Sequence, residues 1–305
     1  MDKKNLGALM VALSALGFGL MAVFAKIAYS EGVNTLTMLS VRFTAACAII
    51  WLVILFTGRR AAVSPGGLCS LAVLSLFGYG GGSTFFFMAV NLLPASLASL
   101  LLYTYPVLVS VAETALYRQR LTAKKLAALF LSTTGLVLVL GAALQGASPA
   151  GLLYGLAASV SYTVYLLYGN RLTRKSPPLL TTGYLLLFAA IGFSAYTFFT
   201  GSFCFAFGPA GWWSIAALAV FSTAFAILAL FSGMRWIEAG RAAIISSCEP
   251  VFTVLCAALF LSERLRPVQI AGGLMVLAAI VLLQYSAPGR TEEPVRGNQS
   301  KQSEI

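Results

Sequence analysis

The stretch "AAIISSCEPVFTVLCAALFL", residues 242–261, decides the class of fold. It contains a single charged group, Glu249, and the helix breaker Pro250 follows directly. About 20 mostly apolar residues are enough for a helix to cross a bilayer. The stretch therefore predicts a membrane-spanning helix with a carboxyl group and a proline near its middle.

The composition of the whole chain agrees with this prediction. Of 305 residues, 59% are hydrophobic and 10% are charged, and the mean hydropathy is +0.90. A soluble domain carries about 25% charged residues, so the sequence predicts an integral membrane protein in a lipid bilayer. The net charge of +11 comes from short basic clusters between apolar runs, which orient membrane helices. We therefore expect no nucleic-acid partner.

Several kinds of chemistry are excluded by residue type. The chain has no histidine, which removes Ser-His and Cys-His nucleophile pairs, HExxH zinc sites and haem ligation. Its five cysteines form no CxxC motif and lie mostly within or beside apolar runs, as small buried hydrophobes do. We expect no metal, no cofactor and no enzymatic activity.

Ten apolar segments are long enough to span a membrane, so we predict an all-α membrane protein with ten transmembrane helices. The segments are 6–28, 35–57, 67–90, 94–117, 124–144, 150–170, 179–200, 210–235, 240–261 and 267–285. If the N-terminus is inside, most of the 20 Lys and Arg residues face the cytoplasm. This predicts a bacterial inner-membrane protein with both termini cytoplasmic and a disordered polar tail over 286–305.

The chain also contains an internal repeat, with an offset of 144 residues. This offset places "YPVL" (105–108) on "EPVF" (249–252), and a proline followed after thirteen residues by Arg-Leu occurs in both copies. The copies cover 6–144 and 150–285. Each has five predicted helices, an odd number, so the second copy is inverted in the membrane, as in many secondary transporters.

The two prolines of this repeat, Pro106 and Pro250, lie near the centres of their helices. Proline has no N–H, so the carbonyl groups of Leu102 and Ser246 lose their helical partners. Polar backbone at that depth is tolerated where protein or a water-filled cavity satisfies it. The prolines therefore mark either packing kinks or a cavity, and the neighbouring Glu249 favours a cavity.

The two segments that carry these features are "LPASLASLLLYTYPVLVSVAETALYRQRLT" (93–122) and "EAGRAAIISSCEPVFTVLCAALFLSERL" (238–265). They resemble the EamA-type branch of the drug/metabolite transporter superfamily. The second half keeps "SERL", whereas the first has Gln119 where the family pattern usually has Glu. The resemblance implies a ten-helix inverted-repeat fold, alternating access, and efflux or uptake of small molecules.

Glu249 is the first candidate site residue, because ionisable groups within a membrane are expensive and usually functional. It can carry a proton or meet a cationic group of a substrate, or it can be a structural carboxyl group hydrogen-bonded within the bundle. Tyr105 is its repeat partner and should lie at the same depth. A tyrosine hydroxyl in hydrocarbon needs a partner, so Tyr103 and Tyr105 join the predicted site, together with Ser246.

Three charged residues nearer the helix ends have two interpretations each. Glu113 is either a coupling group or a partner for nearby arginines. Lys26 and Arg42, predicted near the outer ends of their helices, either extend to the membrane interface or form an outer gate. The glycine-rich "GYGGGS" (78–83) predicts close helix packing, with a hinge as the alternative.

Together these features predict a secondary carrier that moves a small-molecule substrate by alternating access. Efflux is the favoured direction, and the energy source is left open between a proton, another ion or solute gradient, and downhill flow. A lipid or lipid-linked-sugar flippase, or its subunit, is the alternative. The sequence does not determine the oligomeric state, and a homodimer is one option.

Overall fold

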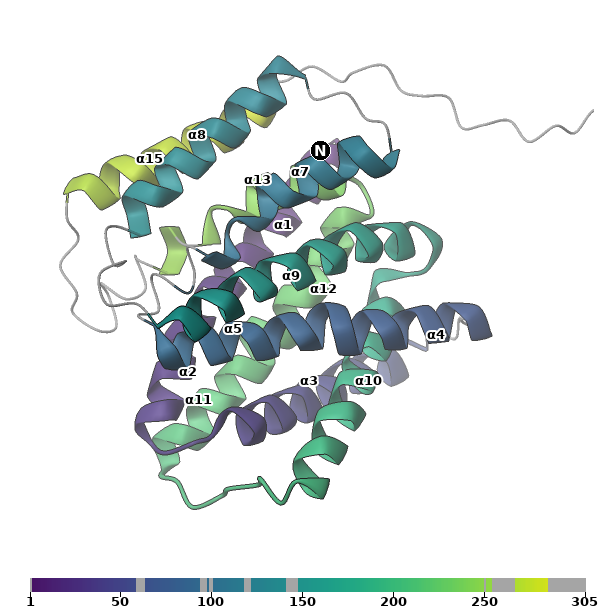
Figure 1. The fold of residues 1–305 in the computed structure, drawn as a ribbon. Coiled ribbons are helices and arrows are strands. Elements are labelled where there is room, and N and C mark those ends of the chain that lie inside the picture. Colours follow the sequence, from purple (N-terminus) through teal and green to yellow (C-terminus); the bar gives the residue numbers. More distant parts are fainter. Residues whose placement is uncertain are drawn as a thin grey trace, which may run out of the picture.

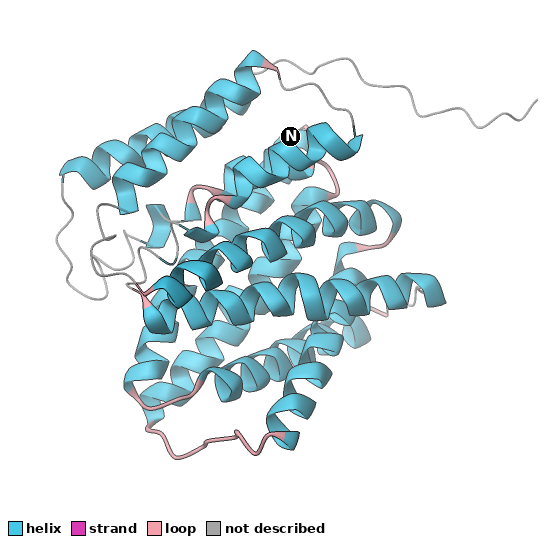
Figure 2. Cartoon of the chain, in the orientation of Figure 1, coloured by secondary structure: helices cyan, strands magenta, loops and turns pink. Residues whose placement is uncertain are grey.

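The computed structural model describes residues 2–58, 64–93, 98, 101–117, 122–140, 148–249, 251–253 and 267–284. All regular structure in these ranges is helical, and Figure 2 shows helices and connecting loops only for the part it describes. The all-α prediction is thus confirmed for the described residues. Parts of several predicted spans lie outside these ranges, so the count of ten helices stays a prediction.

In the described ranges, the first half of the chain contains the following helical elements (Figure 1). They are α1 (Lys3–Gly19), α2 (Met21–Ser30), α3 (Thr35–Thr57), α4 (Pro65–Val73), the π-helix η1 (Leu74–Gly80), α5 (Gly81–Leu92), α7 (Tyr105–Tyr117) and α8 (Ala123–Leu140).

The second half, where it is described, contains the remaining helical elements. They are α9 (Pro149–Lys175), α10 (Pro178–Phe199), α11 (Pro209–Ala219), the π-helix η2 (Val220–Phe225), α12 (Ala226–Met234), α13 (Ala239–Ser246) and α15 (Pro267–Gln284).

Among the described residues, six stretches of helix are long and apolar enough to cross a membrane. They are Lys3–Ser30, Thr35–Thr57, Pro65–Leu92, Pro149–Arg174, Pro178–Phe199 and Pro209–Met234. Local signals set their ends. Asn34 caps α3 by accepting a hydrogen bond from Thr37 N at 2.8 Å, and Gly58 ends it in the left-handed conformation with φ 62°. Prolines stand at the first turns of α4, α9, α10 and α11, where a missing N–H costs nothing.

The inner packing repeats with the same offset as the sequence. Gly17 of α1 packs on α12, where a Cβ added to it would lie 3.1 Å from the Cβ of Ala226. The positions 144 residues away are Ser161 and Gly82, and a Cβ on Gly82 would lie 3.4 Å from the Cβ of Ser161. The glycine is on α1 in the first pair and on α5, the equivalent of α12, in the second. The helices nevertheless cross at equivalent positions. The pairs α1–α12 and α9–α5 are therefore equivalent contacts.

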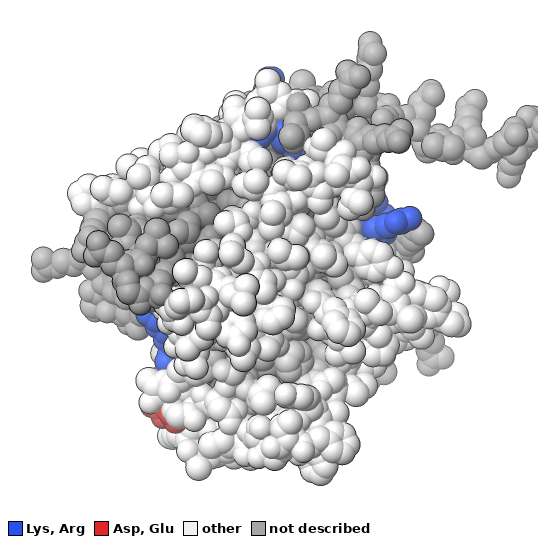
Figure 3. All heavy atoms as spheres, viewed as in Figure 1, with Lys and Arg blue, Asp and Glu red and all other residues white. Residues whose placement is uncertain are grey.

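Two further pairs join equivalent elements of the two halves: α3 packs on α10, and α8 packs on α15. Figure 1 shows α8 and α15 side by side at one edge of the molecule. The outer surface suits lipid. The face in Figure 3 is almost free of charged atoms, and large hydrophobic side chains such as Phe56, Phe199 and Trp213 are exposed.

Several predicted helices are interrupted rather than continuous. The predicted helix 6–28 divides at Leu20 into α1 and α2, and the predicted helices 67–90 and 210–235 each contain a π-segment. The helix predicted over 94–117 turns at residues 103–104, just before α7. The helix predicted over 240–261 turns at 247–248, just after α13. Continuous apolar runs hide such breaks, because a turn within a membrane protein does not need polar residues when neighbouring helices satisfy its backbone.

Candidate functional site

Two kinds of interruption occur at equivalent places in the two halves, whereas the break at Leu20 has no counterpart in the continuous helix α9. The turn at Tyr103–Thr104 and the turn at Ser247–Cys248 are 144 residues apart, and the ranges of η1 and η2 overlap under the same offset. π-Segments are uncommon and are found disproportionately at functional sites. Interrupted helices near the middle of the membrane mark substrate sites in secondary transporters.

Pro106 explains one of the turns. It is the second residue of α7, where a proline is tolerated because its missing N–H would have no helical partner. The preceding residues bond with a shorter spacing: Thr104 N donates to Leu101 O at 3.3 Å. Cys248 N likewise donates to Ile245 O at 3.1 Å in the second half. Pro250 itself lies outside the described residues.

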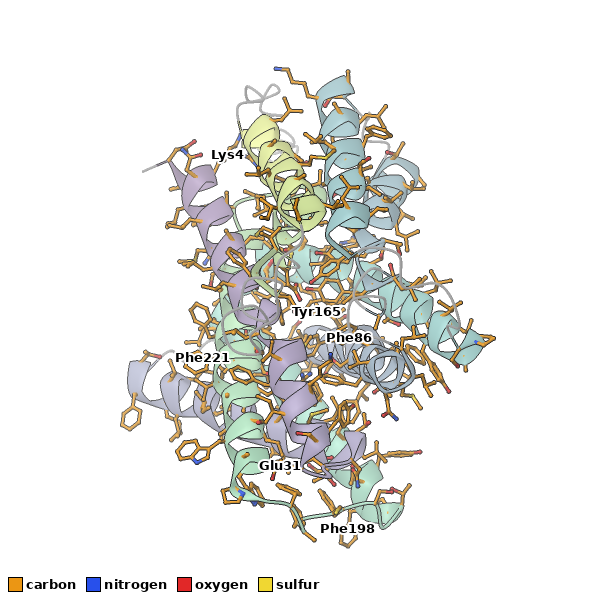
Figure 4. All side chains as sticks on the ribbon, turned by 90° about the vertical axis from the view of Figure 1, so that its left-hand side faces the viewer. Lys4, Glu31, Phe86, Tyr165, Phe198 and Phe221 are labelled. Atoms are coloured by element: carbon orange, nitrogen blue, oxygen red, sulfur yellow. The ribbon has the colours of Figure 1, made fainter. Side chains whose placement is uncertain are left out.

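A pocket lies where these breaks meet. Its lining residues are Phe18, Met21, Tyr79, Gly82, Ser83, Phe86, Leu102, Tyr105, Tyr162 and Glu249. They come from both halves of the chain. Figure 4 labels Phe86 and, beside the pocket, Tyr165, and both lie between the ends marked by Lys4 and Glu31. The space open to the centre of a water molecule is about 30 Å³, enough for a water or two but not for a metabolite. The pocket is therefore nearly closed in this conformation.

Among the described residues that line the pocket, Glu249 is the acidic one, and it is 7% exposed. The hydroxyl of Tyr103 is its hydrogen-bond partner. Tyr105, the repeat partner of Glu249, lines the same pocket and is fully buried. Its hydroxyl pairs with the side chain of Ser246 and lies 3.5 Å from the carbonyl oxygen of Ala243. The structure thus brings together Glu249, Tyr103, Tyr105 and Ser246.

A chain of tyrosine rings extends from this group, and its members beyond Tyr105 were not among the predicted site residues. The ring centroids of Tyr105 and Tyr162 are 4.8 Å apart, those of Tyr162 and Tyr165 are 5.3 Å apart, and those of Tyr165 and Tyr79 are 5.1 Å apart. The hydroxyl group of Tyr165 is buried and has no hydrogen-bond partner in the described part of the chain. Buried hydroxyl groups without a partner are rare and usually meet a water or a ligand.

Side chains of neighbouring helices bond to the backbone around the pocket. Thr253 Oγ1 donates to Gly19 O at 2.9 Å, and Ser222 Oγ donates to Gly17 O at 2.8 Å. Thr104 Oγ1 lies 2.7 Å from Ser159 Oγ. These bonds supply partners for backbone and hydroxyl groups near the breaks, which lipid could not do.

Arg42 differs from its prediction. The expected extension to the membrane interface does not occur, because the side chain is fully buried between α3 and its neighbours. Its Nη2 donates to Ser83 Oγ and its Nη1 to Met21 Sδ, both at 3.3 Å. The guanidinium carbon lies 4.6 Å from the ring centroid of Phe43 and 5.0 Å from that of Phe87. The rings of Phe43 and Phe87 offer the guanidinium a site inside the helix bundle. Their position beside Arg42 could not be predicted from the sequence.

Glu113 lies away from the pocket and joins three elements. One carboxylate oxygen, Oε2, pairs with Lys125 Nζ of α8 at 2.6 Å. The other, Oε1, accepts the backbone N–H of Gly240, near the start of α13, at 2.8 Å. An added Cβ on Gly240 would displace the Glu113 carboxylate from this position. Glu113 therefore connects the first half of the chain to the second.

Lys26 lies apart from both groups, exposed on α2. In the described part of the chain, no three His, Cys, Asp or Glu side chains gather as metal ligands. The cysteines Cys47, Cys69, Cys204 and Cys248 are unpaired.

The fold and the pocket define a helical, multi-pass membrane protein whose polar site is formed by interrupted helices. The sequence profile of the EamA-like transporter family matches the chain twice, over residues 5–141 and 149–285. The chain belongs to this family, and it is a membrane transporter rather than an enzyme.

Similar proteins support the assignment. An uncharacterized transporter of Archaeoglobus fulgidus is 27% identical over 274 residues, which cover 89% of this chain and 94% of that protein. The uncharacterized transporter YcbK of Bacillus subtilis is 25% identical over 293 residues, which cover 92% of this chain and 93% of that protein. A solved crystal structure at 21% identity has a TM-score of 0.79 and covers 92% of this chain and 98% of its own, so the fold is shared.

Proposed function

We propose that the chain is a secondary carrier that exports a small solute by alternating access, with the pocket around Glu249 as the substrate site. The observation that carries this proposal is the meeting of interrupted helices from both halves at one pocket. Such breaks provide polar backbone and a place to bend. The pocket is nearly closed here, so the carrier must open toward one side before a solute can enter.

Glu249 is the proposed proton carrier. Its hydrogen-bond partner is Tyr103, and the other titratable groups near enough to interact with it are Tyr79, Tyr105, Tyr162 and the thiol of Cys248. None of these is a cation at neutral pH, so nothing among them forms an ion pair with the carboxylate. A carboxyl group in such a place can bind a proton in one state and release it in another.

Glu113 has a different proposed role, as a latch on the side of the molecule where the chain begins. The N-terminal segment marks this side, because Lys3 Nζ lies 5.2 Å from the ring centroid of Trp236, shortly before α13. Glu113 and Lys125 belong to the first half, and Gly240 to the second. The halves cannot separate on this side without breaking the Gly240 N–H bond to the carboxylate, so the described state is latched there. With the N-terminus inside, this is the cytoplasmic side.

The test compares metabolites in the medium of cells that express wild type, Glu249→Gln or a Ser30→Ala control. Ser30 is exposed on α2 and bonds only locally, to Ile27 O. At equal membrane levels, we expect a solute to accumulate outside with wild type and the control but not with Glu249→Gln. Equal export by all three variants would make Glu249 a structural carboxyl group.

Proton coupling needs its own measurement. Uptake of that solute into inside-out vesicles, which corresponds to export from the cell, should depend on an imposed pH gradient in wild type, and the dependence should disappear in Glu249→Gln while some downhill movement remains. An unchanged pH dependence in Glu249→Gln would remove the coupling role.

A lipid or lipid-linked-sugar flippase remains the second candidate, since a fold of this kind can also pass a headgroup between its halves. Liposomes with a fluorescent lipid in one leaflet distinguish the two. Scrambling or flipping by the purified protein, without solute transport, would favour the flippase.

Location and assembly are likewise proposals: a bacterial inner membrane, both termini cytoplasmic, and a homodimer as one assembly. Reporter fusions to the C-terminus test the orientation, and light scattering of the purified protein tests the assembly.

A further inference from the structure

The charge on Arg42 has no obvious counterpart. The side chain is 0% exposed, and a guanidinium offers five N–H donors. Its Nη1 bonds to the thioether of Met21, its Nη2 bonds to the hydroxyl of Ser83, and its Nε has no partner in the described part of the chain. Within that same part, the one ion pair is Lys125 with Glu113, so no described carboxylate lies within 4.0 Å of Arg42.

The contacts that Arg42 does make replace water poorly. A thioether sulfur is a weak acceptor, and a buried charge without a paired anion is strongly unfavourable. The faces of Phe43 and Phe87 offset part of this cost through cation–π attraction. A neutral side chain would pack here at lower cost, so the charge needs a reason other than stability.

The position of Arg42 supplies that reason. Met21 and Ser83, the two residues that accept its hydrogen bonds, both line the pocket. The guanidinium therefore lies one side chain behind the pocket wall, on the side of α2 and α5. Methionine is flexible and unbranched, so the Met21 thioether can move and leave its donor for a better acceptor.

We propose that Arg42 is an anion subsite of this pocket, where a carboxylate or phosphate group of the solute displaces the thioether of Met21. A planar guanidinium suits both groups, since it can donate two parallel hydrogen bonds to them. The apolar side chains of Phe18, Phe86 and Leu102 line the rest of the pocket. They favour an organic anion with an apolar body. This inference rests on the proposed function of the pocket and assigns its substrate class.

Thermal unfolding of the purified full-length protein in detergent, followed by its tryptophan fluorescence, tests the subsite. The probes are benzoate, phenyl phosphate and benzamide, which share a ring and differ in the charge and shape of the polar group. We expect at least one anion, but not benzamide, to raise the melting temperature of wild type, by about 3 °C at ten times its Kd. Benzoate and phenyl phosphate show which anionic group fits.

Three variants complete the test. In Arg42→Gln, the anion-specific shift should disappear and the melting temperature without probe should stay the same or rise. Arg42→Lys keeps the charge without the planar fork, so it should bind the anion about tenfold more weakly and provides a second variant if Arg42→Gln does not fold. In Met21→Leu, the shift should persist or grow, since the competing acceptor is gone.

Three results would each overturn the subsite. The first is an equal shift of the melting temperature by the anions and benzamide, and the second is no shift by either anion. The third is an anion-specific shift that persists in Arg42→Gln. The proposed transport function can fail separately. If the anions bind through Arg42 but no solute is exported, the subsite stands and the transport proposal falls. If a neutral or cationic solute is exported, transport stands and the subsite falls.

Discussion

Glu113→Gln should loosen the latch between the two halves without unfolding the protein. Glutamine keeps an oxygen that can accept the backbone N–H of Gly240, now 2.8 Å from Glu113 Oε1. It lacks the charge of the carboxylate and loses the ion pair with Lys125. The helix around Glu113 should otherwise stay intact, because glutamine and glutamate are similar in size and helix propensity.

The size of the effect follows from which bond opening must break. Glu113 and Lys125 both belong to the first half, so of the two bonds that Glu113 makes, separation of the halves breaks only the one to Gly240. A hydrogen bond to a charged group contributes about 1.5–3 kcal/mol, and one between neutral groups about 0.5–1.5 kcal/mol. The variant therefore loses about 1 kcal/mol of latch stability, which shifts the opening equilibrium about fivefold.

Amide hydrogen exchange measures this shift directly. The amide of Gly240 donates the bond, so the peptide that covers residues 238–246 should exchange about fivefold faster in Glu113→Gln than in wild type. Peptides from α3 serve as an internal reference and should not change.

The matched control is Glu238→Gln. Glu238 precedes the same helix and is exposed, but its side chain makes no capping hydrogen bond. The same chemical change should therefore leave exchange in residues 239–246 near the wild-type rate. If Glu113→Gln matched this control, the carboxylate would not hold the halves together and the latch would be wrong.

Three stability predictions test the packing around the site by thermal unfolding. Gly233→Ala should destabilise the protein by about 1–3 kcal/mol, because an added Cβ would lie 2.6 Å from a backbone oxygen of α1. In the control Gly66→Ala, the added Cβ lies in open space, so the change should be neutral or slightly stabilising. Tyr165→Phe removes a buried hydroxyl without a partner in the described part of the chain, so stability should rise by about 1 kcal/mol, and a fall would reveal a hidden partner. Thr253→Val removes the bond to the backbone of α1 and should cost about 1 kcal/mol; no loss would mean that water replaces it.

Much of the candidate site could be predicted from the sequence, because a proline breaks the helix that contains it and the repeat relates positions by a constant offset. Pro106 predicted a break in its helix, and the break is there, two residues before it. The repeat predicted that Tyr105 and Glu249 lie at the same depth, and both line the pocket. These predictions needed only the geometry of a helix and one alignment of the chain with itself.

Other features depend on contacts that no local pattern contains. Long basic side chains tend to extend to the membrane surface, and the prediction that Arg42 does so was wrong. The rings of Phe43 and Phe87 offer its guanidinium a site inside the helix bundle. The partner of Glu113 is a backbone N–H more than a hundred residues away. The glycines of 78–83 predicted close packing, and Gly82 does pack on Ser161 of α9. The π-segment that contains Gly78 and Gly80 was not predicted, because its extra residue per turn leaves no periodic signal in an apolar run.

The two π-segments also bear on the ancestry of the chain. A π-segment forms when one residue is inserted into an α-helix, and here the same helix of each half carries one at an overlapping position. A single insertion in an ancestral five-helix polypeptide, followed by gene duplication and fusion, accounts for both, whereas two later insertions would have to coincide in place. Such an ancestor would have worked as two identical copies in opposite orientations. Its π-segment would then be older than the fused chain, which now contains two copies of it.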